Sequence, residues 1–374
     1  MSLTFHWFLP TSGDSRSVTP FGPAGHFRPP SLDYLTDLAR AAERLGFEGV
    51  LTPTGTHYLD AWIVTSALMA ATKRLKFLVA FRPGLVSPTL AAQQAVAFQQ
   101  LSGGRLLLNV VTGGSDEEQQ RFGDWLDHDA RYARTDEFMK ILRGAWADEP
   151  YYFAGQHYQV AGATASAKPE PIPPLYFGGA SAAAEAVAAA RSDVYLTWGE
   201  PPEHVAPRIA RVRALAARHG RVVRFGIRLH VISRPTAEEA WAEADRFLHQ
   251  LSPEVIETAQ ASIGRTQSVG QQRMIDLHRG RTDRLVVAPN LWAGYGLIRG
   301  GAGTALVGSY EEVAERIAEY HSLGFDEFIF SGYPHLEEAH WFAEGVFPVL
   351  RRRGLLDGSA AAPASRTPIA AAAR

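Results

Sequence analysis

Strand-like and helix-like segments alternate along nearly the whole chain, and this alternation constrains the fold more than any single motif. Short β-branched or aromatic runs lie at 4–9, 49–52, 75–81, 105–112, 175–178, 193–198, 225–232 and 327–330. Stretches with helical spacing lie at 32–45, 61–72, 91–101, 135–147, 182–191, 207–219, 237–251 and 311–323. Eight strands alternating with eight helices favour a parallel (β/α)8 TIM barrel over an open doubly wound sheet.

We expect a single domain over residues 1–356 of the 374-residue chain, with two regions beyond the plain barrel. The stretch 252–288 is polar, carries several arginines and is too long for an ordinary connection. Two interpretations are open for it: a mobile lid that closes over a site, or a plain helical insertion. The tail 357–374 is biased toward Ala, Pro and Ser without apolar periodicity, so we expect it to be disordered.

Composition narrows the classes of protein. The 37 Lys and Arg residues nearly balance the 39 Asp and Glu residues, for a formal charge of −2, which disfavours nucleic-acid binding through overall charge. The absence of cysteine excludes disulfides, Cys-ligated zinc, iron–sulfur clusters and thiol nucleophiles. No basic signal-peptide start and no membrane-spanning apolar run are present, so we expect a cytoplasmic protein without nucleic-acid or membrane partners.

Several common catalytic motifs are missing. The sequence holds no HExxH, no dense His/Asp/Glu cluster with metal-ligand spacing and no GxSxG elbow. It also lacks GxxxxGK[ST], and no GxGxxG follows the first strand. We therefore expect no metal and no hydrolytic serine, and favour an enzyme whose chemistry is carried by an organic cofactor.

The strand at 225–232 carries the most informative polar residues. In a (β/α)8 barrel the active site lies at the carboxyl ends of the strands. Alternation places Gly226, Arg228, His230 and Ile232 on one face, opposite a wholly apolar face that would pack on the helices. Arg228 and His230 are therefore predicted to point into the barrel mouth, as an anion site or as part of a structural ion pair.

Neighbouring strand ends add to this pattern. Tyr333 and His335 follow the eighth strand, and Trp198 ends the sixth. In the fifth unit, Gly178 and Gly179 lead from a strand directly into a helix, where backbone N–H groups favour an anion such as a phosphate. A tight strand-to-helix turn would need the same glycines.

Nine segments resemble the bacterial alkanesulfonate monooxygenases, flavin-dependent members of the bacterial-luciferase-like family. They are FHWFLPT (5–11), TPTG (52–55), NVVTG (109–113), PLYFGG (174–179), YLTWGEPP (195–202), FGIRLHVI (225–232), PNLWAG (289–294), IRGGAGTALVG (298–308) and SGYPHLEE (331–338). The resemblance runs from about residue 3 to residue 350.

The resemblance implies a two-component oxygenase in a luciferase-like barrel. A separate NAD(P)H-dependent flavin reductase would supply FMNH2, which is used with O2 to cleave the C–S bond of an organosulfonate, giving sulfite and an aldehyde. A homodimer or homotetramer is implied as well, and 252–288 would match the family's mobile loop.

Site residues follow from the resemblance position by position. The resemblance implies Arg228, His230, Tyr333 and Arg299 as catalytic residues and Trp198 as a wall of the site. From their places after strand ends, His57, Tyr58 and His335 are expected to bind substrate as well. Around FMN the resemblance places Thr112, Tyr132, Ala180 and Ser181, and the glycine loop adds Gly179.

One segment departs from the family pattern. After TPTG, alkanesulfonate monooxygenases typically read Arg-Ser-Cys-Glu, whereas this chain has Thr56-His57-Tyr58-Leu59. The added hydrogen-bonding groups suggest a polar organosulfonate, such as the sulfosugar sulfoquinovose or its glycerol conjugate, rather than a plain alkanesulfonate. Alternatives are a luciferase-like monooxygenase for a non-sulfonate substrate, a deazaflavin-dependent dehydrogenase, and a non-catalytic flavin-binding protein.

Overall fold

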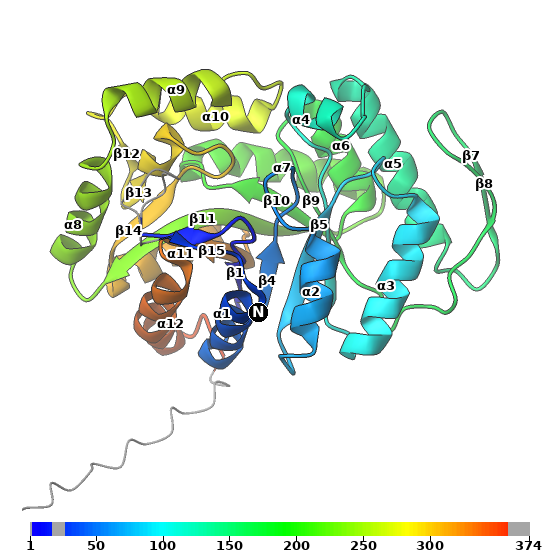
Figure 1. Ribbon diagram of the computed structural model, residues 1–374, viewed down its shortest axis with the longest axis horizontal. Helices are drawn as coiled ribbons and strands as arrows, with labels where there is room; N and C mark the ends of the chain where they lie inside the picture. Colours follow the sequence, from blue (N-terminus) through cyan, green and yellow to red (C-terminus); the bar gives the residue numbers. More distant parts are fainter. Residues whose placement is uncertain (1, 17–26, 358–374) are drawn as a thin grey trace, which may run out of the picture.

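Eight parallel strands close into a barrel in the computed structural model, which describes residues 2–16 and 27–357 (Figure 1). The barrel strands are β1 (Thr4–Phe8), β4 (Gly49–Thr52), β5 (Lys76–Phe81), β6 (Leu106–Val110), β9 (Leu175–Gly178), β10 (Val194–Trp198), β11 (Arg224–Arg234) and β15 (Glu327–Ser331). Pairing between β10 and β11 completes the circle. The predicted (β/α)8 barrel is confirmed.

The strand β11 is longer than the barrel needs. Its first half pairs with β10 and β15, which sets Arg228 beside Trp198 and Ile329. Its second half pairs with β14 (Ala305–Ser309), a strand that the sequence did not reveal. This extra partner explains why the strand continues past the predicted end at 232, to Arg234. Ile232 accordingly packs outside the barrel, in the apolar cluster beside α8 (Ala237–Leu248).

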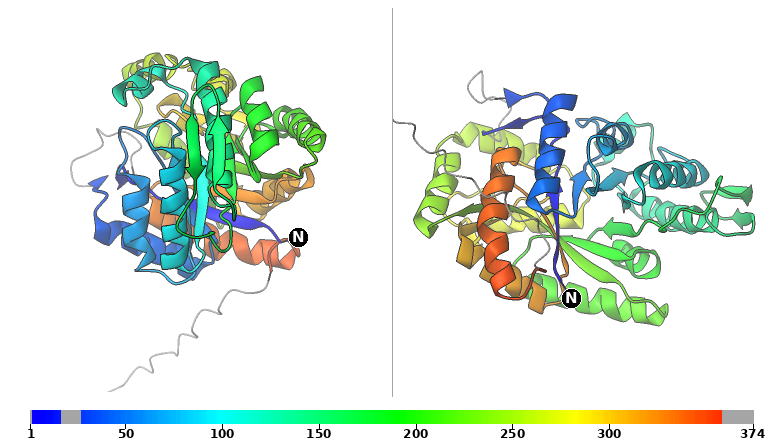
Figure 2. Two further views of the ribbon diagram at one scale, coloured as in Figure 1. Left: turned by 90° about the vertical axis from the view of Figure 1, so that its right-hand side faces the viewer. Right: turned by 90° about the horizontal axis from the view of Figure 1, so that it is seen from below.

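Helices surround the strands (Figure 2). They are α1 (Leu32–Leu45), α2 (Ala61–Met69), α3 (Pro88–Ser102), α5 (His128–Gly144), α6 (Ala182–Arg191), α7 (Pro202–Arg218), α11 (Tyr310–Ser322) and α12 (His335–Arg352). The helix that follows the last barrel strand is therefore α12, which the sequence pattern missed. The predicted helix at 237–251 corresponds instead to α8, in the long insertion between β11 and β15.

Three helices begin earlier than predicted. Side-chain caps explain two of them, because Ser87 accepts from Leu90 N at the start of α3 and Asp127 accepts from Ala130 N at the start of α5. The third, α7, begins at Pro202, where a proline loses no helical bond. Pro207, predicted as its start, lies inside the helix.

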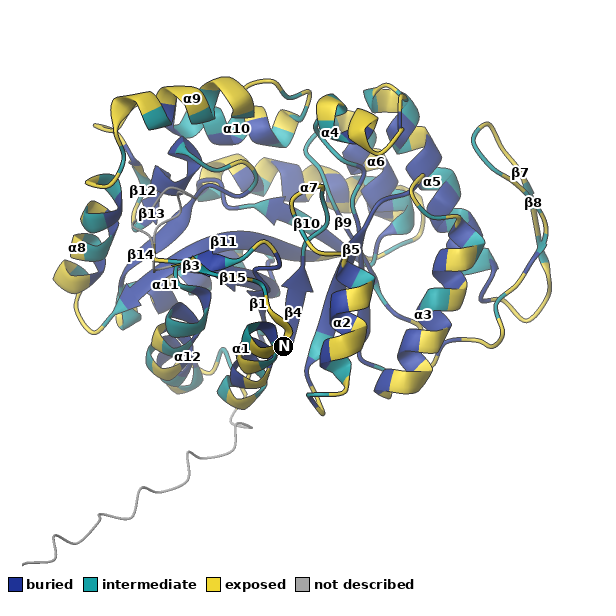
Figure 3. Ribbon diagram, viewed as in Figure 1, coloured by how far each residue is buried: buried dark blue, intermediate teal, exposed yellow. Residues whose placement is uncertain are grey.

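The described residues form three apolar clusters: a large one between the strands and the helices, a small one inside the barrel, and the one beside α8 that includes Ile232 (Figure 3). The apolar face of β11, with Ile227, Leu229 and Val231, belongs to the outer core as predicted. The inner core contains Phe8, Leu51, Leu78, Leu107, Tyr176, Val194 and Ile329. This inner core lies inside the barrel, beneath the side chains at the carboxyl ends of the strands.

Further short elements lie outside the eight barrel strands and their surrounding helices. They are β2 (Asp14–Ser15), β3 (Phe27–Arg28), α4 (Asp116–Arg121), β7 (Tyr151–Ala154), β8 (Gln159–Ala163), α9 (Pro253–Ile263), α10 (Val269–His278), β12 (Val286–Ala288), β13 (Leu291–Trp292) and the 3-10 helix η1 (Gly294–Leu297). The predicted tail lies, apart from Asp357, outside the described residues. No described helix is long and apolar enough to cross a membrane.

A buried carboxylate closes the opposite end of the barrel. Glu327 accepts from the Tyr176 hydroxyl at 2.7 Å, lies 3.2 Å from His6 Nε2 and pairs with Arg224. Burial alone would raise the pKa of Glu327, but the hydrogen bond and charge of His6, together with Arg224, hold it below the ordinary value.

We expect Glu327→Gln to lower the free energy of unfolding at pH 7 by about 3 kcal/mol, because it removes the charge that compensates Arg224 and disturbs the buried hydrogen bonds with His6 and Tyr176. A depressed carboxyl pKa stabilises the fold above the ordinary Glu pKa, and that contribution is lost as the pH falls through the folded value. The difference between variant and wild type should therefore narrow below about pH 4. Urea titrations at pH 7 and pH 4 measure both effects.

The control is Glu337→Gln, which breaks the half-exposed pair with Arg28. It should change the free energy of unfolding by less than about 1 kcal/mol. Equal losses in the two variants would contradict the role assigned to Glu327.

Candidate active site

The side chains of β11 meet those of the last strand at the barrel mouth. Arg228 and His230 lie on the face predicted from alternation, and His230 is directly opposite Ser331 of β15. Ser331 lies 2.7 Å from Arg228 Nη2 and 2.7 Å from His230 Nδ1. A single buried hydroxyl therefore joins the two polar side chains of the strand.

Arg228 is buried without an anionic partner. Its side chain donates to Ser331 Oγ and to the Leu229 carbonyl, and its guanidinium lies 4.9 Å above the ring of Phe8. Arg299 lies over the same ring at 5.6 Å and donates to the Tyr333 hydroxyl. In the part of the chain that the structure describes, neither guanidinium forms a salt bridge.

The burial of Arg228 without an anion among the described residues strongly affects its pKa. Burial, reinforced by the charge of Arg299, lowers the pKa of Arg228 well below its ordinary value. An uncompensated buried cation destabilises a protein unless an anion accompanies it. The pair Arg228 and Arg299 is therefore suited to bind an anion that enters the mouth.

The hydrogen bonds of His230 fix its tautomer. The Ala302 carbonyl, 2.9 Å from Nε2, can only accept, so Nε2 carries the proton. Nδ1 then accepts from the Ser331 hydroxyl, whose oxygen accepts from Arg228. Burial, followed by the charges of Arg228, Arg299 and His335, lowers the pKa of His230 well below its ordinary value. His230 is neutral at pH 7, and both ring nitrogens are occupied.

Tyr333 and His335 lie next to His230 at the barrel mouth. The Tyr333 ring stacks on His230 at 5.5 Å between centroids, and the His335 ring meets Tyr333 edge-on at 4.9 Å. His335 is the first residue of α12, and its Nδ1 lies 2.8 Å from Asp14 Oδ1. The structure thus brings these two residues to the arginine pair, as the sequence predicted.

The other predicted substrate-binding residues, Tyr58, Trp198 and His57, differ in their burial and contacts. Tyr58 packs on the inner core and lies close enough to Arg228 to affect its pKa. Trp198 ends β10 and packs against Gly270. His57, next to Tyr58, is exposed to solvent.

The residues predicted around FMN gather at the start of α6. Ser181 caps this helix by accepting from Ala184 N, and Ala180 precedes it. Gly179 has φ +150°, and a Cβ at this position would lie 3.0 Å from the Tyr132 hydroxyl and 2.5 Å from Ala184 Cβ. The loop needs glycine, and this backbone cradle at a helix N-terminus fits a phosphate.

Thr112 is buried at the end of β6, and its hydroxyl lies 3.3 Å from the Thr135 hydroxyl. Its side chain is therefore directed toward α5, beside the cradle, rather than left free.

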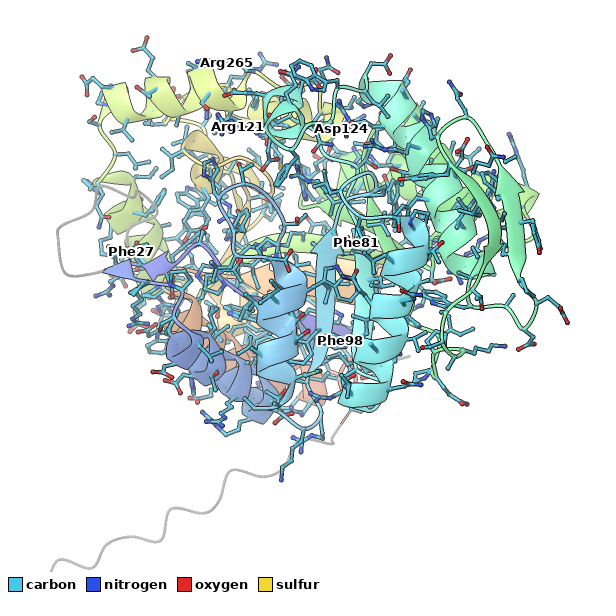
Figure 4. All side chains as sticks on the ribbon, turned by 45° about the vertical axis from the view of Figure 1, so that its right-hand side comes forward. Phe27, Phe81, Phe98, Arg121, Asp124 and Arg265 are labelled. Atoms are coloured by element: carbon cyan, nitrogen blue, oxygen red, sulfur yellow. The ribbon has the colours of Figure 1, made fainter. Side chains whose placement is uncertain are left out.

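The segment 252–288 folds as helices over the carboxyl ends of the strands (Figure 1). Thr266 donates to the Gly114 carbonyl at 2.9 Å, and the Gln271 amide oxygen accepts from Gly301 N at 2.7 Å. Arg265, between α9 and α10, lies at the same end of the barrel as α4 (Figure 4). The segment thus bridges loops on opposite sides of the mouth.

Sequence reasoning missed several contributors to the site. Ser331 and Ala302 orient His230, Phe8 lies under both guanidiniums, and Asp14 holds His335. Ser331 was within reach of the pattern, since it ends the eighth strand directly before the SGYPH motif. The others depend on contacts between distant segments.

Residues 3–327 match the luciferase-like monooxygenase family, and the chain belongs to this family. Among solved structures, it is similar to a riboflavin lyase crystallised with modified FMN and riboflavin, with 24% identity, a TM-score of 0.79 and coverage of 97% of this chain and 94% of that chain. An EDTA monooxygenase from Chelativorans sp. BNC1 aligns with 18% identity, a TM-score of 0.76 and coverage of 97% and 96%. A long-chain alkane monooxygenase aligns with 19% identity, a TM-score of 0.77 and coverage of 96% and 93%. These likenesses concern the fold.

We expect Thr266→Val to loosen the segment over the mouth, because it removes the bond that the hydroxyl donates to the Gly114 carbonyl and the bond that it accepts from Ser268 N–H, without changing the size of the side chain. Losing about 1 kcal/mol of local stability should raise the rate of trypsin cleavage after Arg265 about three- to tenfold. Thr282→Val, at an exposed position of the same segment, is the control. Equal cleavage rates in the two variants would mean that these bonds do not hold the segment.

Proposed function

We propose that this chain is a flavin-dependent monooxygenase that cleaves the C–S bond of an organosulfonate to give sulfite and an aldehyde. In this proposal a separate NAD(P)H-dependent reductase supplies the reduced flavin. The single observation that carries the proposal is the pair Arg228 and Arg299, whose guanidiniums lie over one ring, that of Phe8, and form no salt bridge among the described residues.

A sulfonate fits this pair by charge and geometry. Its three oxygens share one negative charge, and each guanidinium offers several N–H donors in one plane. A neutral alkane would leave Arg228 desolvated and unpaired, which is unfavourable in a closed pocket. The arginine pair therefore favours an anionic substrate over the uncharged substrates of the alternative interpretations.

In this proposal the phosphate of FMN binds away from the arginine pair. The cradle formed by Gly179, Ala180 and Ser181 at the start of α6, with the Tyr132 hydroxyl beside it, fits a phosphate. The arginines on β11 and on the loop before β14 are then left for a second anion. Reduced FMN supplies, with O2, the oxygen atom that enters the substrate.

The chain's own groups prepare the pocket. Ser331 and His230 hold Arg228 in one orientation, so that little side-chain entropy is lost when an anion binds. The Tyr333 hydroxyl accepts from Arg299, which leaves its proton to donate to a substrate oxygen. The helices over the mouth exclude water and strengthen these polar interactions.

Sulfite release tests the proposal. Protein with FMN, NADH, O2 and an unrelated flavin reductase should release sulfite from at least one member of a panel of alkyl and polyhydroxylated sulfonates. Arg228→Gln and Arg299→Gln should each lower kcat/KM by about 30- to 1000-fold, since each removes about 2–4 kcal/mol of charge-assisted binding.

The control is Arg281→Gln, which alters an exposed arginine of the segment over the mouth. Its activity should equal that of wild type. Absence of sulfite with every sulfonate, in protein that binds reduced flavin, would contradict the proposal.

We further propose that the substrate is polar, such as a sulfosugar. Tyr58, where alkanesulfonate monooxygenases typically have cysteine, lies beside Arg228 and offers a hydroxyl to a hydroxylated carbon chain. The exposed side chain of His57 gives this idea no further support.

Tyr58→Phe should lower kcat/KM for polyhydroxylated sulfonates about fivefold and leave the values for alkanesulfonates nearly unchanged, because one hydrogen bond contributes about 1 kcal/mol. Parallel sulfite assays with the two substrate classes measure this ratio. A uniform decrease, or a wild-type preference for medium-chain alkanesulfonates, would contradict a polar substrate.

A further inference from the structure

One histidine of the pocket has a free nitrogen. His335 Nδ1 lies 2.8 Å from Asp14 Oδ1, and the backbone N–H of His335 donates to Asp14 Oδ2 at 2.8 Å. His335 is 2% exposed, and its Nε2 has no hydrogen-bond partner within the described residues. Other buried histidine nitrogens of the chain also lack a partner, but His335 Nε2 does so next to the residues of the barrel mouth, where an entering ligand can meet it.

Asp14 determines the state of this ring. Burial alone would raise the pKa of Asp14, but the charge and hydrogen bonds of His335, with the hydroxyl of Tyr34, hold it below the ordinary value. A carboxylate can only accept, so Nδ1 carries the proton and Nε2 of the neutral ring bears the lone pair. The Tyr34 hydroxyl donates to the second oxygen of Asp14 and completes its hydrogen bonding on that side.

His230, unlike His335, has no ring nitrogen left to meet a ligand. Both of its ring nitrogens are engaged, with Ser331 and with the Ala302 carbonyl, and neighbouring cations oppose its protonation. The two histidines therefore differ in hydrogen bonding, and the sequence assigned the catalytic role to His230 and substrate binding to His335.

The surroundings of His335 place it next to the arginine pair. Its ring lies 5.6 Å from the ring of Phe8, over which both guanidiniums also lie. The charged or titratable groups around it are Asp14 and Tyr34 on the outer side, and Tyr333, His230, Arg228 and Arg299 on the pocket side. On α12 itself, Glu337 and Glu338 are paired with Arg28 and Arg234.

We propose that His335, positioned by Asp14, is the base that accepts a proton in this pocket. The step rests on the proposed function: once oxygen has been inserted, the reacting carbon bears a hydroxyl and the sulfonate. The O–H bond breaks and its proton goes to His335 Nε2, while the O–H electron pair forms the C=O bond. The C–S bond breaks, its electron pair leaves with sulfite, and the Asp14 carboxylate balances the imidazolium charge.

The first test uses no sulfonate. In protein labelled with 15N-histidine, the Nδ1 signal of His335 should be that of a protonated nitrogen, and the Nε2 signal should be that of an unprotonated one. The signals of His230 should be those of a neutral ring with the proton on Nε2. A His335 ring that carries its proton on Nε2 instead would overturn the proposal.

The second test uses His335→Asn, whose amide nitrogen replaces Nδ1 against Asp14 and removes Nε2. We expect kcat/KM for sulfite release to fall about 10²- to 10⁴-fold, with a smaller change in KM than in kcat. The control is His340→Asn on the same helix, where the histidine pairs with Glu344 at the surface. Wild-type activity in His335→Asn would overturn the proposal.

The variant Asp14→Asn distinguishes a role of Asp14 in positioning His335 from a purely structural role. Without the carboxylate the imidazolium is less stable, so the rising limb of the pH profile of kcat/KM should move to lower pH while the maximum falls. A uniform decrease without this movement would show a merely structural role and would overturn the part assigned to Asp14. An unprotonated His335 Nε2 in a protein that releases no sulfite would overturn the proposed function and leave the proton-accepting site in place.

Discussion

The pairing of β11 with three strands is the constraint on which the site depends. Its lower half closes the barrel against β10 and β15, and its upper half is held by β14. A shift of one residue would turn Arg228 and His230 into the outer core and bring apolar side chains into the mouth. Because the opposite face of β11 is wholly buried among apolar residues, that shift is strongly disfavoured. The core thus fixes the orientation of the polar residues.

Among the described residues, the buried charge at one end of the barrel has charged partners, whereas the buried charge at the other end has none. At the closed end, Glu327 is satisfied by His6, Tyr176 and Arg224, as a structural ion network should be. At the mouth, Arg228 has a hydroxyl and a carbonyl but no anion among the described residues. Both arrangements use the strands β11 and β15, so the fold is able to compensate a buried charge and does so at one end. The contrast favours an anion-binding function for the mouth over a structural one.

Periodicity in the sequence predicted the barrel and the inward face of β11 because both depend on local alternation. It did not predict β14, since a strand that merely extends another one has no distinct pattern. It also counted α8 as part of the ring and missed α12, because alternation reveals the order of elements and not which element packs on which strand. His57 and Tyr58 are adjacent in sequence, yet only Tyr58 reaches the inner core. Such differences arise from loop geometry.

Pairs of residues far apart in the chain explain what local patterns leave out. Asp14 and His335 are 321 positions apart, and only closure of the barrel, with β1 beside β15, brings their segments together. The same closure gives the two histidines different surroundings: His230 supports Arg228 through Ser331, and His335, beside a carboxylate, has one nitrogen without a partner among the described residues. A histidine that holds an arginine in place must have its nitrogens occupied, so a different residue has to exchange protons. The division follows from hydrogen-bonding capacity, since one imidazole has only two nitrogens to share between these tasks.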